Sequence, residues 1–184
     1  KEYTYDENGT SCSQVNNYYK DGVLFKSIKC GKGNIKKFEE KYDPETGKIT
    51  EEIEYNKYER PCRRITYTYD KDNNLVNEIE LTKSDLIVKN YEYKKGKLAR
   101  TSTVKNHTII DITEYDENEN IIMEHKYNDN GVILSRKQNK YDGNGIQTNV
   151  IIKNGYDKME YAAYFDYETS ELQEIPEPKL NIKG

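Results

Sequence analysis

The sequence has no tryptophan, only three phenylalanines and no long apolar run. Hydrophobic residues make up 34% of its 184 residues even with 18 tyrosines counted, and mean hydropathy is −1.10. No segment approaches the roughly 18 apolar residues of a membrane-spanning helix, so we expect no membrane span. This shortage also argues against a two-layer sandwich, in which every strand needs a continuous apolar face. We therefore expect a thin fold with large solvated faces.

The sequence also lacks an excess of basic charge. It has 29 basic and 33 acidic residues, a net charge of −4, and the two signs are interleaved throughout. Nucleic-acid-binding proteins usually gather basic residues into a stripe, whereas Lys36-Lys37 is followed at once by Glu39-Glu40. We therefore expect no nucleic-acid partner. Disorder is also disfavoured, because disordered chains are poor in the aromatic and β-branched residues that are abundant here.

Three cysteines are present, without the paired CxxC spacing of a zinc site. A hairpin that turns at residues 20–22 brings Cys12 close to Cys30. A three-residue loop places the two cysteines opposite each other, whereas a two-residue type I′ turn of Asp21-Gly22 offsets them by one position. A disulfide between Cys12 and Cys30 and a pair of ordinary buried thiols both fit this spacing.

What the sequence does contain is a repeated phrase: a tyrosine, a short turn rich in Asp, Asn and Gly, then an aliphatic residue. Three copies lie in "TEYDENENIIMEHKYNDNGVILSRKQNKYDGNG", Thr113 to Gly145. An Asp or Asn caps the turn with its side chain, and a Gly or Asn at its end accepts positive φ. The tyrosine and the aliphatic residue then face each other across a hairpin. Further copies follow Tyr5, Tyr19, Tyr42, Tyr69 and Tyr93, with a degenerate one after Tyr167.

Between the turns the residues alternate with period two, as in "RITYTYD". The segment most similar to a helix, "KFEEKY", has no N-cap. We predict an all-β protein of about a dozen or more strands, an antiparallel meander of consecutive β-hairpin repeats that forms an elongated twisted sheet or spiral. A closed β-barrel is the alternative. One domain is predicted over residues 1–174, with an extended or mobile tail over 175–184.

The connections at the other edge of this meander are expected to be less regular. They include "YNKYERPC", where Pro61 is unlikely to occupy a central strand, and "IKNGYDK".

The repeat resembles the YD-repeat family, the tyrosine–aspartate repeats of RHS-type bacterial surface and toxin-shell proteins. The matching segments are "YTYDENG" (Tyr3–Gly9), "YTYDKDNNL" (Tyr67–Leu75), "YEYKKGKL" (Tyr91–Leu98) and the three copies quoted above. A second resemblance, through "YYKDGVLFKSIK" (Tyr18–Lys29), is to the MORN-like variant repeats of bacterial antitoxin-type proteins. Both resemblances imply β-hairpins strung along one direction, and they differ in the function that they imply.

Motifs of common enzymes are missing: there is no GxGxxG, P-loop or GxSxG. A metal or catalytic site would need His107 and His125 to meet a carboxylate such as Asp111 or Glu114. The Asp-rich turns lack the ligand order of an EF-hand. We therefore predict no catalytic residues, no metal site, no cofactor and no enzymatic activity.

The repeated tyrosines have two interpretations. Tyr115, Tyr127 and Tyr141 are candidate binding residues, because a row of tyrosines offers apolar area and hydroxyl groups to a sugar or peptide. Alternatively, each tyrosine covers the aliphatic residue across its hairpin and serves as the core. In that case the expected partners are Ile121, Ile133 or Val132, and Ile146, respectively.

These observations predict a non-catalytic bacterial repeat module, exported or surface-exposed, with an extended β face for a protein or glycan partner. The bacterial origin is inferred from the bias toward Lys, Asn, Ile, Glu and Tyr, which suggests an AT-rich genome. The alternative is a cytosolic immunity- or antitoxin-like protein that neutralises a partner protein by covering its surface. The chain begins at Lys1 rather than Met, which fits an excised secretory signal and equally a chosen boundary. Export is the expected localisation, with a cytoplasmic location as the alternative.

Overall fold

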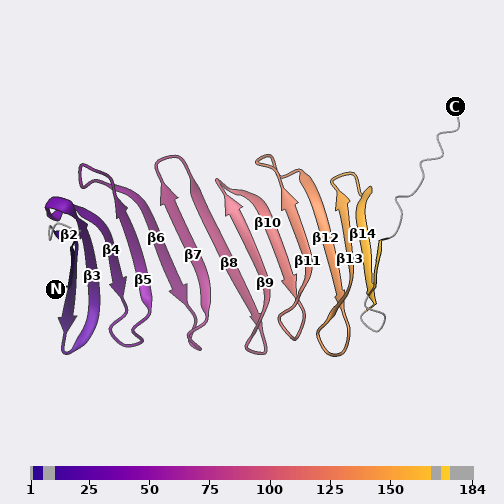
Figure 1. Ribbon diagram of the computed structural model, residues 1–184, viewed down its shortest axis with the longest axis horizontal. Coiled ribbons are helices and arrows are strands. Elements are labelled where there is room, and N and C mark those ends of the chain that lie inside the picture. The colour runs from indigo at the N-terminus through magenta and orange to yellow at the C-terminus, as the bar shows by residue number, and fades with distance from the viewer. Residues whose placement is uncertain (1, 6–10, 167–170, 175–184) are drawn as a thin grey trace, which may run out of the picture. The chain divides into compact units, whose positions relative to one another are not determined.

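The computed structural model describes residues 2–5, 11–166 and 171–174, which form fifteen β-strands and one 3-10 helix, η1 (Lys32–Asn34) (Figure 1). The strands are β1 (Glu2–Tyr5), β2 (Ser11–Lys20), β3 (Val23–Gly31), β4 (Lys36–Tyr42), β5 (Ile49–Tyr55), β6 (Pro61–Tyr69), β7 (Leu75–Thr82), β8 (Leu86–Lys94), β9 (Lys97–Lys105), β10 (Thr108–Tyr115), β11 (Ile121–Tyr127), β12 (Ile133–Tyr141), β13 (Gln147–Asn154), β14 (Met159–Asp166) and β15 (Glu171–Glu174).

Each strand is hydrogen-bonded to its neighbours in chain order, from β1 to β15. The predicted all-β antiparallel meander is therefore confirmed. The alternative of a closed barrel is wrong, because β1 and β15 stand at the two ends of the strand order. No helix in the described part of the chain is long and apolar enough to cross a membrane.

The contacts divide the chain into two compact units, Lys1–Lys89 and Asn90–Gly184, where the sequence suggested one domain over 1–174. The predicted tail, residues 175–184, and the turns expected after Tyr5 and Tyr167 lie outside the described residues.

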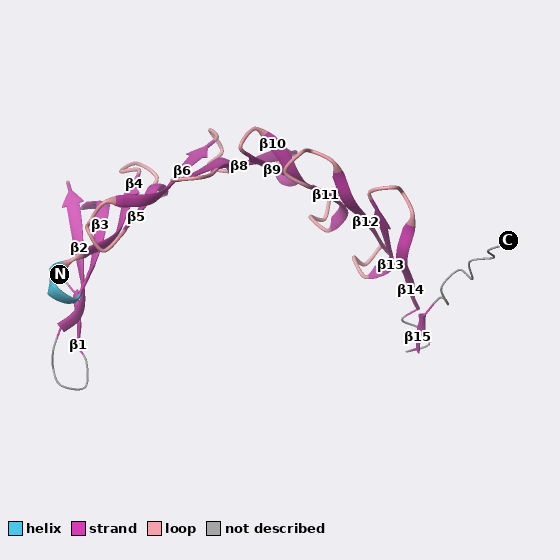
Figure 2. Ribbon diagram, turned by 90° about the horizontal axis from the view of Figure 1, so that it is seen from above, coloured by secondary structure: helices cyan, strands magenta, loops and turns pink. Residues whose placement is uncertain are grey.

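Within each unit the described strands form one layer, with no second sheet on either face (Figure 2). Burial is correspondingly sparse. The apolar side chains that are buried among the described residues are Cys30, Ile53, Ile65, Val150 and Ala163. The low apolar content of the sequence is thus matched by a sheet whose two faces both reach solvent.

Alternation along the strands assigns each side chain to a face. In the first unit, one cross-strand row contains Glu40, Glu52, Ile65 and Glu80, and the opposite row contains Glu39, Ile53, Arg64 and Leu81. The first row lies on the face that also carries Tyr67, which we call the Tyr67 face. The second row lies on the opposite face, which we call the Glu39 face. In the second unit, Thr113, Glu124 and Lys137 lie on the Thr113 face, and Glu114, Met123 and Gln138 lie on the Met123 face.

Six hairpins have the same five-residue turn, beginning at Asn56, Asp70, Asp116, Asn128, Asp142 and Asn154. The first residue's N–H donates to the carbonyl four residues later, and the fourth residue's N–H donates back to the first carbonyl. The first side chain's Oδ1 accepts the N–H groups two and four residues later. The fourth residue always has positive φ, as a type I turn with a G1 bulge requires.

These turns occur at both edges of the meander, so the expectation of one irregular edge is wrong for "YNKYERPC" and "IKNGYDK". Asn56 and Asn154 do there what Asp does elsewhere, because either side chain offers the Oδ1 acceptor. Pro61 is the first residue of β6, a strand position that needs no N–H donor.

The hairpin of β2 and β3 turns in two residues, since Asp21 and Gly22 both have positive φ. A bulge at Phe25 then shifts the register, so that Gln14 rather than Cys12 lies opposite Cys30. Cys30 is a buried free thiol, and the possible disulfide with Cys12 falls on a side chain outside the described part of the structure.

Candidate functional site

Two of the turn tyrosines each connect their hairpin to the preceding one at the same edge of the sheet. The Tyr69 hydroxyl donates to the Ile49 carbonyl at 3.0 Å, and the Tyr141 hydroxyl donates to the Ile121 carbonyl at 2.9 Å. In both cases the acceptor is the first residue of the preceding hairpin's second strand. The Lys48 ammonium group also lies 4.6 Å from the centre of the Tyr69 ring, within range of a cation–π interaction.

Tyr55 makes the corresponding connection through a buried carboxylate. Its hydroxyl donates to Glu39 at 3.0 Å, and Lys26 and Lys36 also bind this carboxylate, Lys26 at 3.0 Å. Glu39 is only 4% exposed. Burial alone would raise its pKa, but the hydrogen bonds from Lys36, Lys26 and Tyr55 outweigh burial and lower the pKa to about 2.

Glutamates at the positive-φ position of two turns form another kind of connection. Glu59 accepts the backbone N–H of Lys36 at 2.7 Å, and Glu119 accepts the backbone N–H of Leu98 at 3.0 Å. A side chain is strained at such a φ, where glycine is favoured. The strain is offset here because each glutamate satisfies a backbone donor of the preceding hairpin.

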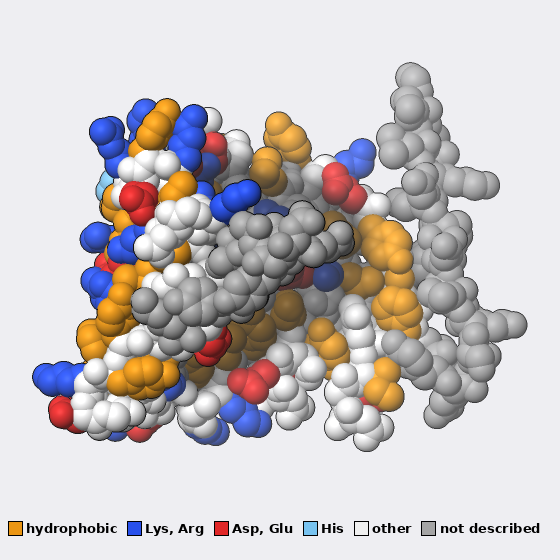
Figure 3. Space-filling view, turned by 60° about the vertical axis from the view of Figure 1, so that its left-hand side comes forward, with side chains coloured by type: hydrophobic (Ala, Val, Ile, Leu, Met, Phe, Trp, Pro, Cys, Tyr) orange, Lys and Arg blue, Asp and Glu red, His pale blue; other side chains and the backbone are white. Residues whose placement is uncertain are grey.

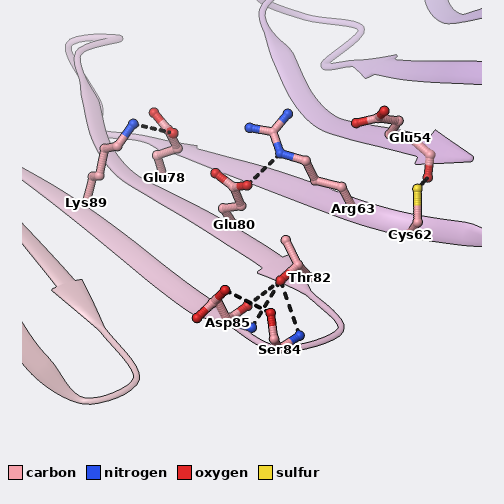
Figure 4. A network of polar contacts seen from close by, with 9 residues as sticks. All are labelled: Glu54, Cys62, Arg63, Glu78, Glu80, Thr82, Ser84, Asp85 and Lys89. Atoms are coloured by element: carbon pink, nitrogen blue, oxygen red, sulfur yellow. Dashed lines mark hydrogen bonds and ion pairs between the residues drawn. The ribbon is translucent and has the colours of Figure 1, made fainter. Parts of the chain in front are cut away.

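Charged side chains cover much of the first unit, and Figure 4 shows one network on β6, β7 and β8. Arg63 pairs with Glu80 at 2.5 Å, and Lys89 pairs with Glu78 at 2.9 Å. Burial and the nearby carboxylates, Glu78 among them, raise the pKa of Tyr67 above its usual range. In Figure 3, basic and acidic side chains are interspersed with apolar ones. In each of these two ion pairs, the basic side chain neutralises the charge of the acidic one.

The surface of the second unit contains a recess of about 500 Å³. It lies between the two-residue turn of Lys95 and Gly96 and the five-residue turn that starts at Asp116. Its lining residues are Lys94, Lys95, Lys97, Leu98, Ala99, Tyr115, Asp116 and Glu117. The volume falls in the range of pockets that bind small molecules.

Of the three candidate binding tyrosines, only Tyr115 lines this recess. By alternation, Tyr115 and Tyr141 lie on the Thr113 face, whereas Tyr127 lies on the Met123 face at the opposite edge. The structure therefore does not bring the three tyrosines onto one surface. All three are half-buried.

The expected tyrosine–aliphatic pairs are confirmed for two hairpins and wrong for the third. Tyr115 is opposite Ile121, and Tyr127 is opposite Ile133. Tyr141 is opposite Gln147, because Ile146 is the last residue of the five-residue turn, where it is 41% exposed.

The two histidines lie in different elements of the fold. His107 is the second residue of a two-residue turn with positive φ, and His125 is in the middle of β11, where its ring contacts Tyr127 edge-on at 6.4 Å. Asp111 lies on the opposite face from His125. Within the described residues, no three His, Cys, Asp or Glu side chains are grouped as a metal site requires.

Sequence reasoning missed the lysines of the recess. Lys94, Lys95 and Lys97 look like an ordinary solvated turn in "YKKGKL", and Glu117 is about twenty residues away. The signal that could have identified the recess is the difference in length between two turns at the same edge of the sheet. The turn between β8 and β9 has two residues, and the turn between β10 and β11 has five.

No known family model matches the chain, and no curated protein matches it. Solved structures do show similarity. The Photorhabdus luminescens Tc holotoxin pore superimposes with a TM-score of 0.56 at 14% identity, over 88% of this chain and 9% of that chain. S. aureus TarM gives a TM-score of 0.33 at 12% identity, over 52% of this chain and 19% of that chain.

A Bacteroides fragilis protein with unknown function gives a TM-score of 0.16 at 11% identity, over 91% of both chains. This chain spans less than a fifth of the TarM and Tc toxin chains. The Tc toxin similarity shows a shared repeat-type β fold.

Proposed function

We propose that this chain is a non-catalytic bacterial hairpin-repeat module of the YD-repeat kind, exported or surface-exposed, that binds a protein or glycan partner. The observation that carries this proposal is the use of the turn side chains. Tyr55, Tyr69 and Tyr141 hold neighbouring hairpins together, so a single-layer sheet is maintained without a thick core. Both faces and the recess beside Tyr115 are left for recognition.

The repeat phrase and the fold support the family assignment together. The Tyr–Asx turns recur through both units, and a part of a Tc toxin has a similar fold. An interaction role follows from the surface: large apolar side chains such as Tyr18, Tyr19, Tyr58 and Tyr156 are exposed on strands or turns rather than packed.

The test is a glycan array and an affinity capture with the purified chain, with bound proteins identified and then re-measured as purified pairs. Saturable binding to a glycan or a purified protein, lost when the chain is unfolded, is expected. Conversion of an arrayed compound into a product, or no saturable binding in either assay, would contradict the proposal.

The alternative, a cytosolic immunity- or antitoxin-like protein, is favoured by one observation. Cys30 and Cys62 are free thiols, and exported proteins more often carry disulfides. Fractionation of cells that make the native, full-length protein separates the two: recovery in the cytosolic fraction supports the alternative, and recovery outside the inner membrane supports export.

A further inference from the structure

Tyr115 lacks the connection that the equivalent tyrosines make. Tyr69 and Tyr141 each donate to a carbonyl beyond the long turn of the preceding hairpin. The hairpin that precedes Tyr115 differs from those two, because it has only the two-residue turn Lys95-Gly96 in place of a long turn. Within the described part of the chain the Tyr115 hydroxyl has no hydrogen-bond partner, and it belongs to the lining of the recess.

Most of the charged side chains that line the recess have a partner within it. Lys97 donates to the Glu117 carbonyl at 2.6 Å, and Lys95 lies 3.8 Å from the Glu117 carboxylate. Asp116 is held by the backbone N–H groups of its own turn and by Asn120. These bonds outweigh burial and lower the pKa of Asp116.

Lys94 is different, because its ammonium group has no acceptor among the described residues, although it lines the recess. Three ammonium groups face two carboxylates here, which leaves one net positive charge. A ligand with one negative charge and several hydroxyl groups would complement both this charge and the unpaired Tyr115 hydroxyl.

We infer that the recess binds an acidic sugar, a glycan unit that carries a carboxylate. Lys94 pairs with the carboxylate, and the Tyr115 hydroxyl hydrogen-bonds to a sugar hydroxyl. The Tyr115 ring, with Ala99 on the same face of the sheet, covers the apolar face of the sugar ring. A folded protein is less suitable here, since a stable protein interface takes about 20–30 residues of each partner, and eight residues line the recess. The inference rests on the proposed function and names its ligand class.

The experiment titrates the intact chain with a galacturonic acid trimer and with the matching neutral galactose trimer, by isothermal calorimetry at fixed ionic strength. We expect the acidic trimer to bind and the neutral trimer to bind at least tenfold more weakly. Lys94→Gln should weaken acidic binding about tenfold or more, because it removes a charge-assisted hydrogen bond. Tyr115→Phe, which keeps the ring, should weaken it severalfold. Melting curves confirm that each variant folds.

The control is Lys140→Gln, which removes the same charge from an exposed lysine outside the recess. It should leave affinity unchanged. Equal losses in Lys94→Gln and Lys140→Gln would overturn the inference, as would equal affinity for both trimers or no binding of either. If neither trimer binds, the array or capture assay can still identify another glycan or protein ligand. If binding of that ligand is unchanged by Lys94→Gln, the proposed function is supported and the recess is not its binding site.

Discussion

Gly155 is the position where the packing of a turn against the neighbouring strand β12 can be tested most sharply. A Cβ added at Gly155 would lie 2.1 Å from the Ile133 carbonyl oxygen and 3.1 Å from its carbon. These are backbone atoms, and the first distance is more than 1 Å short of a normal van der Waals separation of about 3.5 Å. Gly155→Ala must therefore push its turn away from β12, at a cost of about 2–3 kcal/mol.

The matched control is Gly143→Ala, at the same position of the preceding turn along the chain. A Cβ at Gly143 meets nothing within 4 Å, and its φ is not in the left-handed region. This substitution should be neutral or stabilise by about 0.4–1 kcal/mol through the unfolded chain. In thermal unfolding, Gly155→Ala should lower Tm by about 5–10 °C. If Gly155→Ala unfolds at the same temperature as Gly143→Ala, the close approach of the Gly155 turn to Ile133 of β12 is wrong.

Three further predictions concern acid stability, thiols and dimensions. Because the folded pKa of Glu39 is about 2 against a usual 4.5, its stabilisation is present above pH 4.5 and is lost as pH falls toward 2; Glu39→Gln should remove up to about 3 kcal/mol of this acid dependence in urea titrations, and an unchanged pH profile would refute the network. In the native chain Cys62 should react with a thiol reagent and Cys30 should not, by mass spectrometry, since Cys62 is exposed and Cys30 is buried; equal labelling of these two would contradict this. The elongated sheet predicted from the sequence requires a radius of gyration above about 16 Å by small-angle scattering, the value for a compact chain of this length.

The sequence predicts the meander well because its turns are local. An Asp or Asn before a residue that accepts positive φ specifies the turn within five residues, as at Asp142 and Gly145. Period-two alternation then assigns the strands between the turns. Neither signal depends on distant parts of the chain.

Register is harder to predict, because one bulge changes every pairing beyond it. The bulge at Phe25 places Gln14 opposite Cys30, and the five-residue turn 142–146 makes Gln147 rather than Ile146 the partner of Tyr141. The recess was missed for a related reason. It depends on how the length of one turn compares with that of another about twenty residues later, which no local pattern encodes.

The central claim is that Tyr69 and Tyr141 each join their hairpin to the preceding one through the hydroxyl group, and that Tyr115, at the equivalent position, keeps its hydroxyl for a ligand. The direct measurement is the free energy of unfolding, from denaturant titration, of the three Tyr→Phe variants. Tyr69→Phe and Tyr141→Phe should each lose about 0.5–1.5 kcal/mol, because a bonded hydroxyl is removed, and Tyr115→Phe should lose nothing. A loss at Tyr115 equal to the other two, or no loss at Tyr69 and Tyr141, would contradict the account.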